Sequence, residues 1–314
     1  MKKFLTLYIL VFIGSLFAGR LLLNPLHFSA LSKTILLDVR LPRIIIASLA
    51  GAGLSLAGLA FQNLFRNYLA GPNIVGASSG AAFGAVLAIL FFSFNPLYIQ
   101  LSSFIFGIIA VTIAYKMSKL VGNGIVGLLL AGIAVSALFT SMVGMAKYMA
   151  DPYDKLPTIV FWLLGSFSGM RWKDLLFLLF PISIGIIGIV LLRWPFNILS
   201  LGDSEAKSLG LNVNIYRKVI IVLAALSVSS ATAIGGIIGW IGLVSPHIAR
   251  LLVGYDNRRL VPASAFVGAT LLLFCDDIAR SIAATELPIS VITSLIGAPL
   301  LILILARRFK YVKN

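Results

Sequence analysis

Long apolar runs, separated by short polar or glycine-rich connections, dominate the chain. They cover residues 4–23, 44–63, 74–93, 98–115, 124–146, 174–193, 217–238, 240–254, 260–281 and 287–306. A helix needs about 20 apolar residues to cross the hydrocarbon core of a bilayer. The pattern therefore predicts an all-α polytopic membrane protein with about ten transmembrane helices. The run 240–254 is short and follows two glycines closely, which predicts a tilted or broken helix.

The composition agrees with a membrane location and with one domain. Hydrophobic residues make up 60% of the chain and charged residues 11%, and the mean hydropathy is +1.06. Soluble domains carry about 45–50% apolar and about 25% charged residues. A soluble enzyme, a disordered chain and a disulfide-stapled protein are therefore excluded. We expect residues 1–314 to form a single transmembrane domain, and we interpret the first run as a span because no small-x-small cleavage site precedes Arg20.

The net charge is +15, from 25 Lys and Arg against 10 Asp and Glu. These basic residues flank the apolar runs and accompany no groove-reading motif, so they indicate contact with membrane lipid rather than nucleic acid. With ten spans and the N-terminus inside, the inner segments carry more Lys and Arg than the outer ones, which predicts that both termini are cytoplasmic. The outer segments still keep much positive charge. It could form a docking surface for an acidic soluble partner, or contact lipid headgroups by snorkelling.

Glycines recur every four residues after a break at Gly71-Pro72. Gly76, Gly80 and Gly84 would then share one face of the following helix. Small residues at that spacing let two membrane helices approach closely. The row predicts either plain helix packing or a helix that slides or tilts at a dimer interface or gate.

A second group of helix breakers precedes and interrupts the run 240–254: Gly235, Gly236, Gly239 and Pro246. His247 and Arg250 follow on one helix face, three residues apart. The chain has only one other histidine, His27, so we expect no metal site here. We interpret His247 as a hydrogen-bonding residue in a helix packing contact.

Ionisable residues close the run 260–281. Asp276 and Arg280 stand four residues apart with the acid first, the more favourable order. We expect this pair to hold the helix end and to present Arg280 outward. A proton relay through Asp276 and Asp277 is the alternative, because ionisable residues inside a membrane are often functional.

The largest predicted cytoplasmic connection contains a candidate short helix at residues 201–213. Asp203 is expected to cap it, Glu205 lies in its first turn, and Gly210 ends it. Ala206 and Leu209 are expected to form a small apolar face. So short a helix is not stable by itself. It would lie either in a groove of a cytoplasmic motor subunit or on the lipid surface.

Catalytic motifs for nucleotide or metal chemistry are missing from the sequence. No lysine follows a glycine, so there is no G-x-x-x-x-G-K-[ST] phosphate loop, and there is no HExxH motif. We therefore expect no catalytic residue, no cofactor and no metal ligand. If transport uses ATP, a different chain binds it.

Taken together, several segments resemble the FecCD family of binding-protein-dependent ABC importer permeases, which serve iron-siderophores, haem and vitamin B12. The resemblance covers residue 36 or so to the C-terminus. The matching stretches are Arg40–Arg43, Arg66–Gly80, Leu201–Val213, Gly242–Arg250, Asp277–Arg280 and Glu286–Pro299.

The resemblance implies the type II ABC importer fold in a prokaryotic plasma membrane. It implies a dimer of ten-span subunits, which we expect to be a homodimer, with two cytoplasmic ATPases and an external substrate-binding protein. By motif match, Arg40, Arg43 and Arg280 would pair with glutamates of the binding protein. The coupling segment, at about residues 200–215, would sit in the ATPase groove. Its matching residues are Leu201, Gly202, Asp203, Glu205, Ala206, Leu209 and Gly210.

This resemblance predicts inward transport of an iron complex, a siderophore or haem, by alternating access, with a corrinoid as the alternative substrate. The pathway would lie at the dimer axis, lined partly by spans 124–146 and 287–306. Two other classes of protein stay open: an ion-coupled transporter using Asp276 and Asp277, and a membrane scaffold.

The sequence departs from the family pattern at Tyr68, where the family usually has proline. The fixed φ of a proline is lost at that position, so the geometry of the loop is not predicted. Five spans in each half predict an inverted internal repeat.

Overall fold

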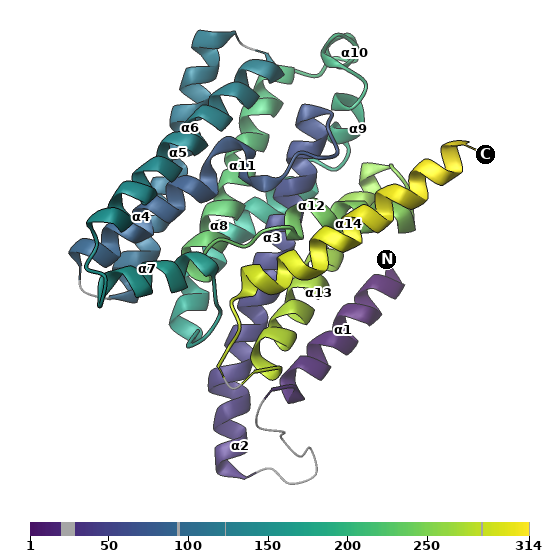
Figure 1. Cartoon of the computed structure of the whole chain (residues 1–314). Coiled ribbons are helices and arrows are strands. Elements are labelled where there is room, and N and C mark those ends of the chain that lie inside the picture. Colours follow the sequence, from purple (N-terminus) through teal and green to yellow (C-terminus); the bar gives the residue numbers. More distant parts are fainter. Residues whose placement is uncertain (20–28, 93–94, 123, 284, 314) are drawn as a thin grey trace.

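The computed structural model describes residues 1–19, 29–92, 95–122, 124–283 and 285–313. Every regular element in this part of the chain is helical (Figure 1). The elements are α1 Lys2–Phe17, α2 Ala30–Thr34, η1 Ile35–Arg40, α3 Leu41–Phe65, η2 Pro72–Val75, α4 Ala77–Phe91, α5 Pro96–Val121, α6 Ile125–Met149, α7 Lys155–Leu164, α8 Trp172–Leu191, α9 Pro195–Leu199, α10 Asp203–Ser208, α11 Val213–Gly235, α12 Ile241–Val253, α13 Asn257–Ser281 and α14 Ile289–Lys313. The predicted all-α fold is confirmed.

Each of the ten predicted apolar runs overlaps one long helix; residues 20–23 of the first run lie outside the described residues. Among those described, six helices are long and apolar enough to cross a membrane: Ala30–Phe65, Pro96–Val121, Ile125–Met149, Trp172–Leu191, Val213–Gly235 and Asn257–Ser281. The first combines α2, η1 and α3 into one continuous helix. α4 and α12 are shorter, as the run 240–254 predicted for α12. The number of spans stays a prediction.

Helices α3 and α11 form the centre of the bundle, and glycines let their neighbours come close. A side chain at Gly51 would collide with the backbone of Gly268 in α13, and one at Gly58 with the backbone of Gly242 in α12. α3 packs against α12 and α13, and α11 packs against α4 and α5. Counting five apolar runs along the chain, α3 corresponds to α11, α12 to α4 and α13 to α5. The two sets of contacts therefore correspond to each other, in agreement with the predicted internal repeat.

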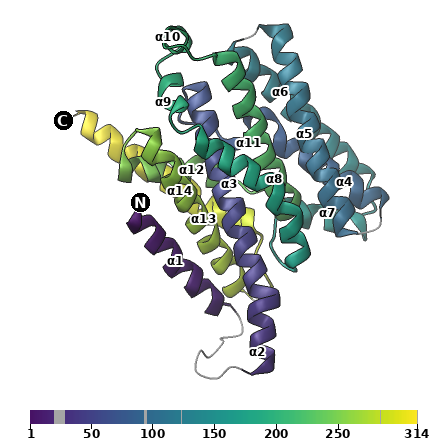
Figure 2. The ribbon, with the colours of Figure 1, turned by 180° about the vertical axis from the view of Figure 1, so that it is seen from behind.

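The two ends of the bundle carry different short elements (Figures 1 and 2). The α10 end holds α9, α10 and the connections 66–71 and 254–256. The α2 end holds α2, the connection 150–154 and residues 285–288. Helix α1 runs from the N-terminus toward the α2 end and α14 runs away from it (Figure 2), so both termini point to the α10 side.

Candidate functional site

The guanidinium of Arg43, at the α2 end, is clamped between two carboxylates. Its Nε lies 2.9 Å from Asp276 Oδ2 and its Nη2 lies 2.8 Å from Asp276 Oδ1, while Nη1 lies 2.8 Å from Glu286 Oε1. Asp276 is fully buried. Two parallel hydrogen bonds to one carboxylate are the strongest arginine geometry. The cluster therefore ties α3 to α13 and to the residues that precede α14.

A second cluster beside it ties α1 to the same region. Arg280 pairs with Asp277 and donates to the Ser15 carbonyl oxygen at 2.5 Å. The Ser15 hydroxyl donates to Asp277 Oδ2, and Arg40 Nη1 donates to the Leu16 carbonyl oxygen at 2.8 Å. The end of α1 is therefore held by two arginines from other helices.

The expected pair of Asp276 with Arg280 is wrong. Asp276 pairs with Arg43, 233 residues away in sequence, and Arg280 pairs with Asp277 at i, i+3. The physical reason is the helix period: successive residues point about 100° apart, so Asp276 faces α3 while Asp277 faces α1. Arg280 turns inward with Asp277 and is 6% exposed, so it is not presented outward.

The three predicted docking arginines do gather at one end of the molecule. Arg40, Arg43 and Arg280 are all buried in this conformation, and each has a partner within the chain. Their docking role stays a prediction. The exposed cations at the same end include Lys33, Arg171 and Lys173.

At the α10 end, the Asp203 carboxylate joins two arginines from different helices. Oδ1 pairs with Arg66, which follows α3, and Oδ2 lies 2.8 Å from Nη2 of Arg217 in α11. The expected capping role of Asp203 is wrong, because Gly202 occupies the N-cap with φ +137 and Asp203 is the first helical residue. Its side chain serves the two guanidinium groups instead.

Other details of the predicted short helix are confirmed, with one correction. Glu205 lies in the first turn, and Gly210 follows the C-cap with φ +81, a left-handed position that favours glycine. Ala206 and Leu209 do not share a face: Ala206 is 0% exposed and Leu209 61%. Leu209 is the C-cap, still bonded through its N–H to the Glu205 carbonyl oxygen, and the left-handed turn follows at Gly210. The Leu209 side chain is exposed there. Leu201, which precedes α10 in the chain, is also exposed.

An asparagine network, which the sequence reasoning missed, fastens α9 to the bundle. The Asn197 side chain accepts hydrogen bonds from the backbone and side chain of Asn257 in α13, and Asn257 exchanges two further bonds with Asn63 in α3. The Asn197 amide also donates to Asp256, which lowers the pKa of that carboxyl together with the Arg258 backbone N–H. The signal in the sequence that could have predicted this network is the presence of an asparagine near the ends of three helices. The segment 195–210 is therefore attached to α3, α11 and α13.

The glycine row after Gly71 is partly corrected. Gly76 is the N-cap of α4 at φ +83 and approaches Val135 and Ser136 of α6. Gly80 and Gly84 face α5, where an added side chain would meet the backbone of Phe106 and of Ser102. This close contact within the chain supports the packing interpretation, and sliding at an interface or gate stays a prediction.

The second group of breakers lies between α11 and α12. Gly235 packs against Phe167, and Gly236 approaches the Trp162 carbonyl oxygen, so both allow the connection 165–169 to come close. An added side chain at Gly239 would meet nothing within 4 Å. Pro246 is buried inside α12. The glycines separate α11 from α12, whereas α12 continues through Pro246 without a break.

The hydrogen bond expected of His247 is confirmed, but its partner lies in the connection 66–71 and not in a packed helix. Its Nε2 lies 2.9 Å from the Tyr68 carbonyl oxygen, and the Arg250 guanidinium lies 4.4 Å from the centre of the Tyr68 ring. The loop without proline is instead built on Asn67, whose side chain accepts from the Leu69 N–H at 2.9 Å. Among the described residues, no group of three His, Cys, Asp or Glu could hold a metal.

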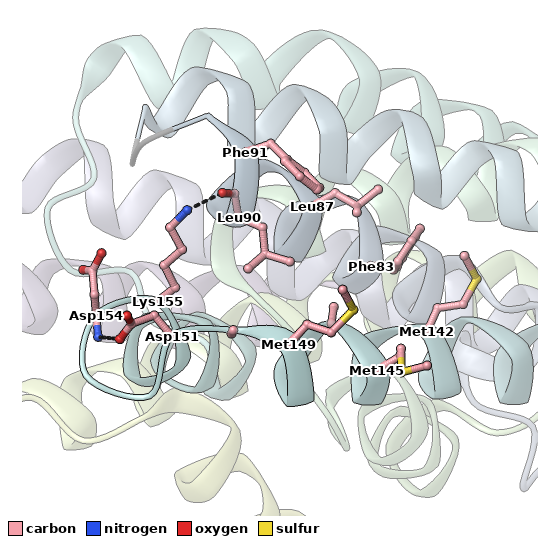
Figure 3. Close-up of a pocket in the computed structure, with 12 residues that line it drawn as sticks. Phe83, Leu87, Leu90, Phe91, Met142, Met145, Met149, Asp151, Asp154 and Lys155 are labelled. Atoms are coloured by element: carbon pink, nitrogen blue, oxygen red, sulfur yellow. Dashed lines mark hydrogen bonds between the residues drawn. The ribbon is translucent and has the colours of Figure 1, made fainter.

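A pocket of about 660 Å³ opens between α4 and α6 toward the α2 end (Figure 3). Its walls are mostly apolar and carry three methionines. The lining residues are Phe83, Leu87, Leu90, Phe91, Met142, Met145, Ala146, Met149, Ala150, Asp151, Asp154 and Lys155. The charged residues are confined to one end. There Lys155 donates to the Leu90 carbonyl oxygen, and Asp151 accepts from the Asp154 N–H. The size suits a small organic ligand.

The comparisons agree with this architecture. The FecCD transport family model matches residues 6–307. The molybdate import permease MolB of Haemophilus influenzae is 42% identical, over 88% of this chain and 82% of its own. A probable iron chelatin transport permease of Helicobacter pylori is 39% identical, over 90% and 86%. Relatives named for hemin and vitamin B12 transport are 38% and 37% identical.

A solved metal-chelate-type ABC transporter in an inward-facing conformation superposes with a TM-score of 0.92 at 39% identity, covering 97% of this chain and 98% of its own. The fold thus recurs in a solved transport permease. The chain belongs to the FecCD transport family and is a multi-pass membrane permease of a metal-chelate-type ABC importer.

Proposed function

We propose that this permease imports an iron complex, a siderophore or haem, by alternating access driven by two separate cytoplasmic ATPases. The observation that carries the proposal is the attachment of α10. Asp203 links α10 to Arg66 beside α3 and to Arg217 in α11, and Asn197 links α9 to α13. A displacement of α10 would therefore be transmitted to α3, α11 and α13.

The ATPase is proposed to contact α10 through its exposed side. Leu201 and Leu209 flank the helix and are exposed, while Ala206 fixes it to the bundle. An exposed apolar side chain on either side of a short surface helix suits a partner groove. The α10 end would then be cytoplasmic, and both termini with it.

A second copy of the chain is proposed to cover α6 and α14. Both helices leave large apolar side chains exposed in the single chain, among them Val126, Leu130, Ile133 and Leu138 on α6 and Leu295, Ile302 and Leu303 on α14. These faces would meet at the dimer axis and line part of the pathway. Lipid would cover the remaining apolar surface.

The α2 end is proposed to receive the substrate-binding protein. Acidic groups of that protein would first meet exposed Lys33, Arg171 and Lys173, since complementary charge steers association. Arg40, Arg43 and Arg280 would reach the partner only after α1 and residues 285–288 move. Reversing the three exposed charges should weaken binding, most at low salt. Unchanged affinity would remove these residues from the docking surface.

The methionine-lined pocket favours an organic metal chelate over a small hydrated oxyanion. Thioethers and aromatic rings pack well on irregular apolar surfaces, whereas molybdate would lose hydration against most of these walls. Lys155, the cation among the described lining residues, lies at one end of the pocket and donates to the Leu90 carbonyl oxygen. The relatives span molybdate, iron chelate, hemin and vitamin B12, so the substrate needs direct measurement. A corrinoid, also a large chelate, is the second candidate.

The test is uptake by the complete complex in proteoliposomes. Ferric siderophores, haemin, cobalamin and molybdate would be supplied with the cognate binding protein and internal ATP. We expect ATP-dependent uptake of an iron complex. Uptake of molybdate or cobalamin alone would overturn the substrate assignment. Uptake that needs no ATP and stops with a protonophore would replace the importer with an ion-coupled transporter.

A further inference from the structure

A polar cavity of about 250 Å³ lies at the α10 end, among α5, α6 and α11. Its lining differs from that of the methionine-lined pocket, because polar and basic side chains predominate. The residues that define it are Tyr115, Ser118, Lys119, Leu128, Asn214 and Arg217. None of the roles described above uses this cavity.

The cavity presents two cationic groups from two helices. Lys119 of α5 lies with its Nζ 5.0 Å from the centre of the Tyr115 ring, and Arg217 comes from α11. No carboxylate is among its described lining residues. Arg217 pairs with Asp203, which lies in α10 outside the lining and also serves Arg66. The local charge is therefore positive.

Neutral groups in the cavity complete a donor set for an anion. The Asn214 amide and the Tyr115 hydroxyl can donate. The Ser118 hydroxyl is already engaged, since it donates to the Tyr115 carbonyl oxygen at 2.7 Å. Arginine, lysine and neutral donors around a small cavity are the chemistry that recognises a phosphate group.

The surroundings place this donor set where a lipid headgroup would lie. Lys119 is near the end of the apolar helix α5, and Leu120 and Val121 beside it are exposed at 87% and 59%. Apolar side chains next to a basic pocket can contact acyl chains while the pocket holds the headgroup. Basic pockets between membrane helices bind anionic phospholipids in this manner.

We propose that this cavity binds a phosphate group, presented by an anionic phospholipid or as free phosphate. Arg217 connects the cavity to α10, because the same guanidinium holds Asp203. A phosphate bound beside Arg217 competes with Asp203 for that guanidinium. Occupancy would thus loosen the attachment of α10, and this regulatory part rests on the proposed coupling function.

The binding test uses the complete transporter and native mass spectrometry with phosphatidylglycerol or phosphatidylethanolamine. Lys119→Gln removes a lining cation, and Lys116→Gln is the matched control, because Lys116 is exposed on the same helix and does not line the cavity. One lysine near a membrane surface is worth about 1 kcal/mol toward anionic lipid, or roughly fivefold in affinity. We expect Lys119→Gln to lose about that factor in retained phosphatidylglycerol and Lys116→Gln to lose none.

Inorganic phosphate provides the second arm. Displacement of the lipid by millimolar phosphate would assign the site to free phosphate, whereas retention would assign it to the lipid. Equal lipid retention by wild type and Lys119→Gln, with no phosphate binding by calorimetry, would overturn the site. Thermal unfolding of both variants checks that the fold is intact.

The regulatory part has its own readout. Substrate imported per ATP would be measured in vesicles with and without phosphatidylglycerol. We expect the ratio of wild type to depend on the lipid and the ratio of Lys119→Gln to be independent of it. Lipid binding with an unchanged ratio would overturn the regulation alone and leave the importer assignment intact. Absence of any import would instead count against the importer assignment.

Discussion

The two ends of this permease use the same chemistry, carboxylates and arginines, in opposite ways. At the α2 end Asp276 is fully buried and gives both oxygens to the single guanidinium of Arg43. At the α10 end the Asp203 side chain is 42% exposed and divides its oxygens between Arg66 and Arg217. The first cluster is enclosed by three segments of the bundle, and the second lies under a short helix at the surface.

This difference has consequences for how each end can work. A buried pair cannot lose one partner without leaving an uncompensated charge, so it fixes one arrangement of α3, α13 and the start of α14. The pair of Asp203 with Arg66, whose side chains are 42% and 39% exposed, contributes little stability and is exchanged easily with water or with another ion. The enclosed cluster suits an end that must stay closed until the bundle moves, and the open cluster suits an end that takes up and transmits motion.

The largest effect is expected from splitting the buried pair. Asp276→Leu leaves Arg43 without its main partner and should lower the free energy of unfolding by about 3–5 kcal/mol. Thermal unfolding of the detergent-solubilised protein measures this change. The double variant Arg43→Met, Asp276→Leu should recover much of the loss, since a well-packed apolar pair can replace a buried ion pair. A double variant no more stable than the single one would show that burial of Asp276 does not depend on Arg43.

The next effect separates two residues of the α10 segment. Ala206→Asp places a charge in a fully buried position and should cost about 3 kcal/mol of stability. Leu209→Asp changes an exposed side chain, so its unfolding should shift by about 0.5 kcal/mol or less. Only the second variant should keep its fold and lose ATP-coupled uptake. Equal destabilisation by both substitutions would contradict the placement of Ala206 and Leu209.

A smaller effect is expected from the exposed pair of Arg66 and Asp203. A double-mutant cycle with Arg66→Ala and Asp203→Ala should give a coupling energy of about 0.2–1 kcal/mol. Raising the ionic strength from about 0.1 M to about 1 M shortens the Debye length from about 10 Å to about 3 Å and should abolish it. The corresponding cycle at Arg43 and Asp276 should change little with salt, so equal salt dependence of the two cycles would erase the contrast between the ends.

The smallest effect concerns pH at the α10 end. The pKa of Asp256 is lowered in the folded state by the Asn197 amide and the Arg258 N–H. Its ionised form therefore stabilises the fold above its unfolded pKa of about 3.8, and this contribution disappears as pH falls through the lower folded value. Unfolding measured between about pH 5 and pH 3 should show a shallower acid-side decline for Asp256→Asn. An unchanged slope would remove Asp256 from the account.

Local properties of the chain could be predicted from its sequence because they depend on neighbouring residues. Apolar runs located the long helices, and the helix-ending role of Gly210 and the hydrogen-bonding role of His247 followed from short segments. The partner of Asp276 could not be predicted, because Arg43 is 233 residues away and only the packing of α3 on α13 brings it near. The same limit applied to Asp203 and to the network around Asn197. Helical spacing predicted a common apolar face for Ala206 and Leu209, but Ala206 packs into the bundle while Leu209, at the C-cap, is exposed.

The most direct test of the contrast between the ends is the number of substrate molecules imported per ATP hydrolysed by the reconstituted transporter carrying Asp203→Ala. Because Arg217 beneath it is only 9% exposed, thermal unfolding and co-purification first check that the variant is folded and assembled with its ATPases, and it should still hydrolyse ATP. The account predicts that import per ATP falls several-fold, because α10 has lost its link to α3 and α11. Import per ATP equal to that of the wild type would contradict the claim that the Asp203 cluster transmits the motion of α10.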